Sequence, residues 1–208
     1  MSAILFASIC PHPPIILPSV GSKEDRNTAK KTIDGLNFLA VKMKEAKPLS
    51  LIISSPHTEW GFDVPLFFLA PKFKGEIKQV LIGSESPAFY FEEGRKIYRE
   101  IIVRAGGSNK IALIASGDLS HCLKKEGPYG FHPHGLKFDR DVIKYLKNKN
   151  IGGLLKLDED YPEAGECGLR SICFILGILE ESKINYKPEV ISYEGPWGVG
   201  YLVANFKL

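Results

Sequence analysis

The chain has 208 residues, of which 44% are hydrophobic and 25% charged, and its formal net charge is +3. These values are ordinary for a globular protein, and they exclude long disordered, collagen-like or coiled-coil segments as main features. The lysines are scattered and the charge is small, which argues against nucleic-acid binding. The longest apolar run, Ile172 to Leu179, is far shorter than a membrane span.

The N-terminal residues Met1 to Phe6 lack the basic segment and long apolar core of a signal peptide, and no lipidation motif appears. The four cysteines have no CxxC spacing, which argues against a zinc ribbon or a thioredoxin-like motif. We therefore expect a cytoplasmic protein with reduced thiols that binds neither membrane nor nucleic acid.

The first half of the chain alternates short apolar runs with segments of helical spacing. Ala3 to Cys10 is predicted to be a strand, and the prolines of residues 11–14 predict a stiff loop after it. A helix is predicted over Lys23 to Lys47, because its apolar residues recur at helical intervals. Leu49 to Ser54 is the second predicted buried strand.

A hairpin is predicted next, from strands at Val64 to Leu69 and Gln79 to Ile82, with Pro65 marking an edge strand. Phe89 to Ala105 has helical spacing, and Ile111 to Ala115 is the third buried strand.

The last third of the chain contains two predicted helices and two predicted strands separated by a turn. They are helices Phe138 to Lys147 and Gly168 to Ile178, strands Pro188 to Tyr193 and Val199 to Phe206, and the turn at residues 194–198. Alternation of helices with continuously apolar strands predicts an α/β fold. We expect a single α/β/α domain over residues 1–208, with a largely buried mixed or parallel sheet.

Three of the five histidines follow predicted buried strands. They are His12, His57 and His121, and the first two come directly after a proline. In open α/β sheets ligands bind beyond the carboxyl ends of the strands, so neighbouring strands of one polarity would bring these side chains into one cleft. A single histidine in such a place is more often a hydrogen-bonded loop residue, but the joint pattern is poorly explained by packing.

Imidazole ligands suit iron, zinc, copper and nickel, and two histidines with one carboxylate form the facial triad of non-haem Fe(II) oxygenases. A third histidine outside the ligand set could act as acid and base, because its pKa lies near working pH.

Several acidic residues are candidates for the third ligand. The alternative role of Asp118 is to brace its own turn, and that of Glu166 is to place a favourable charge at a helix N-terminus. Cys167 is a rival to Glu166, because thiolates bind zinc and iron well, although a free cysteine is more often simply buried. The other candidates are Glu59 and Glu163, which are equally well explained as solvated loop charges.

Four segments together resemble a known family, the class III extradiol ring-cleavage dioxygenases of the LigB-like superfamily. They are Cys10-Pro11-His12-Pro13-Pro14, Ser55-Pro56-His57, Ser116-Gly117-Asp118-Leu119-Ser120-His121 and Gly165-Glu166-Cys167-Gly168. The resemblance extends over nearly the whole chain and is strongest to the branch related to the Memo proteins.

The resemblance implies that His12, His57 and Glu166 bind Fe(II), and that His121 acts as a base toward a catechol hydroxyl. It implies an aromatic substrate, dioxygen, and pairing with a second copy or a partner subunit. His132 and His134, in a lid-like segment, are candidates for substrate binding, although solvated histidines would look the same.

The Memo branch carries a cysteine near the place of the third ligand, and Glu166 and Cys167 are adjacent here. Three functions therefore stay open: an iron-dependent extradiol dioxygenase, a Memo-like metal-binding protein with an interaction or redox role, and a zinc hydrolase that activates water.

Overall fold

The structure is a computed structural model that describes residues 4–103 and 110–208. Its described strands are β1 (Ile4–Cys10), β2 (Ser50–Ser55), β3 (Glu76–Leu81), β4 (Ile111–Ser116), β5 (Lys187–Glu194) and β6 (Tyr201–Lys207). They form one six-stranded sheet in the order β3-β2-β4-β1-β6-β5. The first four of these are parallel, β6 is antiparallel to β1, and β5 is antiparallel to β6. The sheet is therefore mixed.

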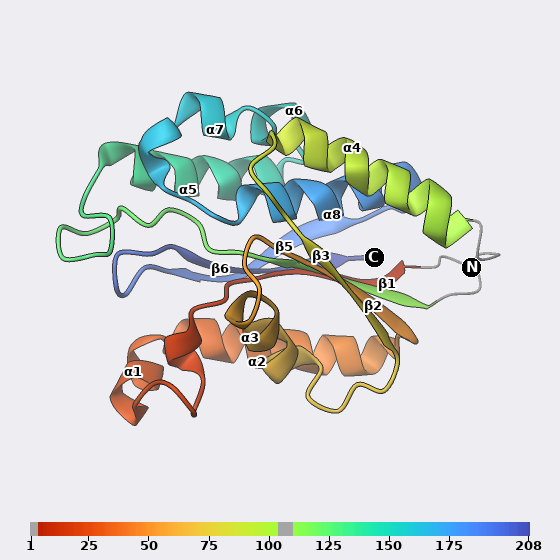
Figure 1. Ribbon diagram of the computed structural model, residues 1–208, viewed down its shortest axis with the longest axis horizontal. Coiled ribbons are helices and arrows are strands. Elements are labelled where there is room, and N and C mark those ends of the chain that lie inside the picture. The colour runs from red at the N-terminus through yellow and green to blue at the C-terminus, as the bar shows by residue number, and fades with distance from the viewer. Residues whose placement is uncertain (1–3, 104–109) are drawn as a thin grey trace.

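Helices cover both faces of this sheet (Figure 1). One layer holds α1 (Lys23–Thr28), α2 (Lys30–Ala46) and α3 (Trp60–Leu69). The other holds α4 (Pro87–Ile97), α5 (Pro133–Lys147), α6 (Ile151–Leu154), α7 (Leu157–Asp160) and α8 (Leu169–Ser182). Shorter helical turns are η1 (Pro14–Ile16), η2 (Tyr98–Val103) and η3 (Pro162–Ala164).

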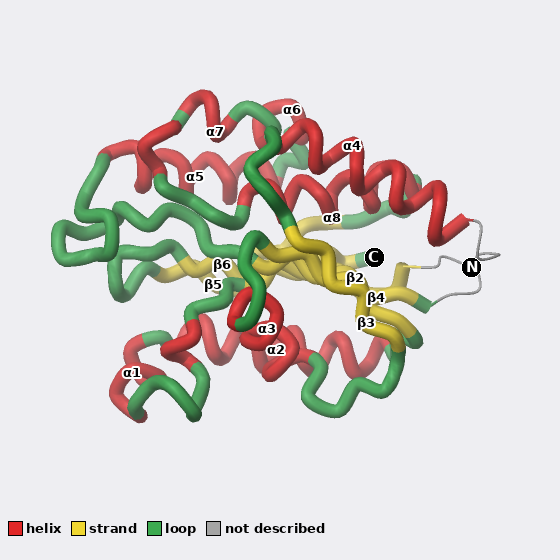
Figure 2. The backbone as a smooth tube through the Cα atoms, viewed as in Figure 1, coloured by secondary structure: helices red, strands yellow, loops and turns green. Residues whose placement is uncertain are grey.

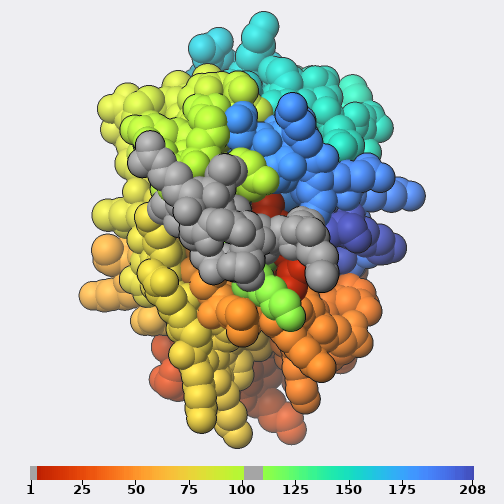
Figure 3. All heavy atoms as spheres, turned by 90° about the vertical axis from the view of Figure 1, so that its right-hand side faces the viewer, coloured from red at the N-terminus to blue at the C-terminus, as the bar shows by residue number. Residues whose placement is uncertain are grey.

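Each face of the sheet has its own hydrophobic core. One core packs the α4, α5 and α8 side against the sheet, and the other packs the α2 and α3 side. Viewed from the side that lies at the right of Figure 1, the yellow-green α4 and the blue α8 lie above, and the orange α2 lies below (Figure 3). The α/β/α architecture predicted from the sequence is confirmed. Among the described helices, none is both long enough and apolar enough to cross a bilayer.

The predicted hairpin is wrong in its first strand, because Val64 to Leu69 belongs to helix α3. The segment is apolar at almost every position, so its periodicity does not separate a strand from a buried helix. Pro65 lies inside this helix rather than on an edge strand.

Other boundaries differ in detail. The predicted helix over Lys23 to Lys47 is two helices, which meet at Ala29. The predicted helix over Phe89 to Ala105 continues from α4 into η2, and its last two residues lie outside the described part of the chain.

The order of the strands determines where the loops meet. β2, β4 and β1 are adjacent and parallel, so their carboxyl ends lie side by side at one edge of the sheet. Long loops, drawn green in Figure 2, gather toward this end of the molecule. The topology required for the histidines to converge is thus present.

Candidate metal centre

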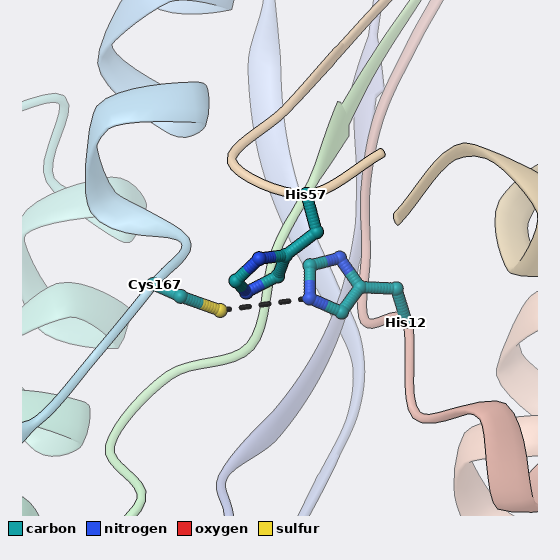
Figure 4. A group of neighbouring side chains, drawn as sticks. All are labelled: His12, His57 and Cys167. Carbon is teal, nitrogen blue, oxygen red and sulfur yellow. Dashed lines mark hydrogen bonds between the residues drawn. The ribbon is translucent and has the colours of Figure 1, made fainter. Parts of the chain in front are cut away.

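Four loops bring five potential ligand side chains together at the carboxyl ends of β1, β2 and β4. His12 follows β1, His57 follows β2, and Asp118 and His121 follow β4. Cys167 comes from the loop before α8 and points toward both His12 and His57 (Figure 4). The ligand atoms of His12, His57 and Cys167 all lie within 4.8 Å of one another, and so do those of Asp118, His121 and Cys167.

Hydrogen bonds determine which nitrogen of His12 faces the cluster. The Ser116 hydroxyl donates its proton to the Gly61 carbonyl at 2.5 Å, and His12 Nδ1 lies 2.9 Å from the same Ser116 oxygen. Because the hydroxyl proton is already used, Ser116 accepts a hydrogen bond from Nδ1–H. The neutral ring then has its lone pair on Nε2, which lies 3.6 Å from Cys167 Sγ.

Pro65 explains why the Gly61 carbonyl is available to Ser116. In an α-helix the carbonyl of residue 61 would accept from the backbone N–H of residue 65, and proline has no such N–H. The Ser116 hydroxyl, at the carboxyl end of β4, satisfies this carbonyl. A helix proline thus contributes to the orientation of a candidate ligand.

Burial keeps His12 neutral. The residue is 2% exposed, and its pKa is lowered to about 3, first by desolvation and then by the neighbouring His57. Its backbone N–H donates to Asp118 Oδ1 at 2.9 Å, and burial raises the pKa of that carboxyl to about 6. Asp118 therefore both fixes the backbone of His12 and supplies an acidic group to the cluster.

Cys167 is held by the loop that follows β4. Its sulfur accepts the backbone N–H of Asp118 at 3.3 Å, and its own N–H donates to the Asp118 carbonyl at 3.3 Å. The loops approach closely because both carry glycine: a Cβ on Gly117 would lie 2.3 Å from the Cα of Gly168. Burial, followed by the Asp118 charge, raises the pKa of the thiol well above its usual value. A bound cation would favour the thiolate instead.

His121 also lies beside the sulfur, with Nε2 4.0 Å from Cys167 Sγ. Burial lowers its pKa, while Asp118 and a hydrogen bond with the Gly165 backbone raise it. The net shift is downward, so the ring is neutral at neutral pH and able to accept a proton.

Glu166, the predicted third ligand, is directed elsewhere. Its carboxylate accepts the backbone N–H of Leu169 at 2.6 Å and pairs with Arg170 at 3.1 Å. Its pKa is raised, chiefly by burial. Among the described residues, Glu166 belongs to neither group of neighbouring ligand atoms, whereas the adjacent Cys167 belongs to both. The geometry thus gives Glu166 the helix-terminus role and places the sulfur in the cluster.

The remaining predicted residues lie outside these two groups as well. His132 is the N-cap of α5 and accepts the backbone N–H of His134 at 3.2 Å, with the two rings 4.7 Å apart. Glu59 and Glu163 are exposed. A role for His132 and His134 in substrate binding stays a prediction.

Three residues to which the sequence analysis gave no role lie beside the predicted site residues. Ser116 contacts His12, Trp60 has its ring 6.0 Å from that of His57, and Tyr129 stacks on His121 at 5.4 Å. Ser116 directly precedes the Gly117-Asp118 segment, which is the one local signal for it. The sequence around Trp60 and Tyr129 gives no local signal that these two side chains lie at the site.

The donor set fits a transition metal. Two imidazole nitrogens and one sulfur suit iron, copper and zinc, and a hydrogen bond that orients the remote nitrogen of a ligating histidine is typical of such sites. His12, His57 and Cys167 would hold the ion, with Asp118 and His121 next to it.

Comparison with known proteins finds similarities in both sequence and fold. Residues 57–204 match the family described as the catalytic LigB subunit of aromatic ring-opening dioxygenase. Protein CA_C1420 of Clostridium acetobutylicum is 28% identical over an alignment of 261 positions, which covers 93% of this chain and 55% of the relative. The chain thus spans about half the length of that curated relative. The crystal structure of the uncharacterized protein JW3007 from Escherichia coli K12 shares the fold, with a TM-score of 0.62 at 16% identity over 98% of this chain and 100% of that one.

Proposed function

We propose a function from one premise, namely that the chain belongs to the LigB family of aromatic ring-opening dioxygenase catalytic subunits. We infer that it is a metal-dependent enzyme of the extradiol type that opens a catechol-like ring with dioxygen. The observation that supports this most is the meeting of the His12, His57 and Cys167 ligand atoms within 4.8 Å at the carboxyl edge of the sheet.

When bound, Fe(II) would supply a centre at which a catechol and dioxygen are activated together. Both oxygen atoms enter the opened product, so the reaction needs no external reductant. His121 is the proposed base: it is neutral, and its Nε2 faces the cluster 4.0 Å from the sulfur. It would take the proton of one substrate hydroxyl. Asp118 keeps His12 in place through the backbone bond at 2.9 Å.

Cys167 favours a second candidate function. A sulfur ligand in place of a carboxylate suits softer metals such as Cu(I) and zinc. With such a metal the protein would carry out redox or binding chemistry without ring opening, or would hydrolyse a substrate with zinc.

The test uses full-length protein purified without oxygen, freed of metal and reloaded separately with Fe(II), Cu(I) or zinc. Ring opening predicts that the Fe(II) form consumes dioxygen and turns a catechol into a yellow product, whereas the zinc form does not. Tight Cu(I) binding without turnover supports the redox function, and hydrolysis by the zinc form without oxygen supports the hydrolase.

Four variants assign the roles of the site residues. His12→Ala should abolish metal binding, whereas His121→Ala should keep the metal and lose turnover. Cys167→Ser should lower metal affinity strongly, and Glu166→Gln should not, because the Glu166 carboxylate binds Leu169 and Arg170. Metal loss in His121→Ala would contradict the proposed division of roles, and metal loss in Glu166→Gln with retention in Cys167→Ser would make the glutamate the third ligand.

A further inference from the structure

Tyr129 makes a specific contact with the proposed base, although it lies in an otherwise exposed loop. Its ring stacks on the His121 imidazole with a centroid distance of 5.4 Å and an interplanar angle of 16°. The residue itself is 70% exposed, so burial of its own surface does not explain why the ring lies there.

The loop that carries Tyr129 is closed at its base. Leu123 and Phe131 form an antiparallel bridge, and Leu123 N–H donates to the Gly198 carbonyl at 3.0 Å. Lys124 Nζ donates to the Pro196 carbonyl at 2.8 Å. The bridge closes the loop, and the two hydrogen bonds join it to the turn between β5 and β6. The loop itself and this turn together hold the backbone on which Tyr129 lies.

Gly165 lies next to both residues. It adopts a left-handed conformation with φ of +62°, and a Cβ built on it would lie 3.9 Å from the Tyr129 ring and 4.0 Å from His121 Cβ. The His121 backbone N–H donates to the carbonyl of Ala164, the residue before Gly165, at 3.2 Å. The Tyr129 ring thus covers one face of the imidazole, and Nε2 lies 4.0 Å from Cys167 Sγ.

We propose that Tyr129 is a positioning residue: its ring, stacked on His121, sets the direction in which the base presents Nε2 to the substrate. This inference rests on the proposed function of His121. A base that transfers a proton must lie within hydrogen-bond reach of it, so a small rotation of the imidazole lowers the rate. The stacking contact is made by the aromatic ring of Tyr129, and the hydroxyl is not needed for it.

The experiment compares Tyr129→Phe, which keeps the ring, with Tyr129→Leu, which removes it. Phe131→Leu is the matched control, because it removes another exposed aromatic ring from the same loop. The Phe131 ring is 47% exposed, and among the described ring contacts it does not stack on His121. The structural readout is the NMR shift of the His121 ring protons in the diamagnetic zinc-loaded protein, which does not depend on activity. The kinetic readout is kcat and KM of the Fe(II) form.

Stacking shields the His121 ring protons, so their resonances should lie upfield in the wild type, Tyr129→Phe and Phe131→Leu, and move downfield in Tyr129→Leu. We expect Tyr129→Leu to lower kcat about tenfold to a hundredfold with little change in KM, and Tyr129→Phe to restore it. Unchanged shifts in Tyr129→Leu would overturn the proposal, as would a Tyr129→Phe variant that is as slow as Tyr129→Leu. If no form turns over any catechol but the shifts behave as expected, the proposed function fails while the placement of the ring by Tyr129 stands.

Discussion

At the scale of single residues, His12 illustrates how neighbours that bind no metal prepare a ligand. Its ring is buried and neutral, and one nitrogen is bonded to Ser116. Because the Ser116 proton is donated to Gly61, the tautomer of His12 follows from a hydrogen bond outside the cluster. In metal sites such outer partners maintain both the ring orientation and the basicity of the ligand.

Ser116→Ala should therefore lower metal affinity about tenfold to a hundredfold while the protein stays folded. The reason is that Nδ1 would lose its acceptor and Gly61 would lose its donor. The measurement is a metal titration against a competing chelator. Ser8→Ala is the control, since it removes another fully buried hydroxyl whose neighbour is Cys10 Sγ at 3.6 Å. Equal metal affinities in the wild type and Ser116→Ala would show that the hydrogen bond between Ser116 and His12 does not contribute to metal binding.

At the scale of elements, the site depends on contact between two loops, one after β4 and one before α8. The backbone atoms of Gly117 and Gly168 are so close that neither position has room for a side chain. The Asp118 carbonyl accepts the Gly168 N–H at 2.8 Å, which joins the loops directly. Because Cys167 precedes Gly168, any separation of the loops moves the sulfur away from His12.

Gly117→Ala should destabilise the protein by about 1–3 kcal/mol, as overpacking usually does, and should also weaken metal binding. Its added methyl group would lie 2.3 Å from the Cα of Gly168, so one of the loops must move. Urea unfolding and the chelator titration measure the two effects. Gly152→Ala in α6, where the nearest atom would be 3.9 Å away, should leave metal binding unchanged and should not destabilise the protein. A Gly117→Ala variant that binds metal as the wild type does would show that the loop contact is not needed.

At the scale of the whole molecule, Asp139 joins three parts of the fold behind the site. It lies on α5, accepts the backbone N–H of Ser120 at 2.8 Å, and accepts the hydroxyl of Tyr193 on β5 at 2.5 Å. Burial raises its pKa to about 7, with a smaller contribution from Glu166, while its two hydrogen bonds oppose the shift.

This shift makes stability depend on pH. The unfolded carboxyl titrates near its ordinary pKa of 3.8, so between about pH 4 and 7 the folded protein holds a proton that the unfolded chain has released. The contribution of Asp139 to the free energy of unfolding therefore falls as the pH rises through this range, by up to about 4 kcal/mol in total.

Asp139→Asn should remove that decline, because the amide carries no charge. Its oxygen still accepts the Ser120 N–H, and its N–H can donate to the Tyr193 hydroxyl oxygen, which reverses that hydrogen bond. Urea unfolding at pH 5 and pH 8 measures the decline, and the variant should gain stability relative to the wild type at pH 8. Asp34→Asn makes the same change of charge on an exposed face of α2 and controls for net charge. If the free energy of unfolding depended on pH in the same way in Asp139→Asn and in the wild type, Asp139 would not be the group responsible for the decline.

Several features of the fold could be predicted because their causes are local. The buried strands β1, β2 and β4 have continuous apolar runs, and α8 is apolar over more than two turns after Gly168. α3 could not be predicted, because an apolar segment with an internal proline is compatible with either a strand or a helix. Its helical form depends on packing against α2 and the sheet.

The choice between Glu166 and Cys167 could not be made from the chain either. Adjacent side chains point in different directions, and the direction of each depends on the left-handed turn at Gly165 and on the contact with Gly117. Both are properties of the assembled loops. The stacking of Tyr129 on His121 likewise joins segments with no common sequence pattern.

Local patterns were thus enough to identify the α/β class, the strand ends and the histidines that follow them, because hydrophobic spacing and proline act over a few residues. They could not show that β2, β4 and β1 lie side by side with one polarity, or that a sulfur rather than a carboxylate faces His12. Those features arise from hydrogen bonds and packing between segments far apart in the sequence, such as the contact between His12 and Cys167, which become neighbours only when the sheet is formed.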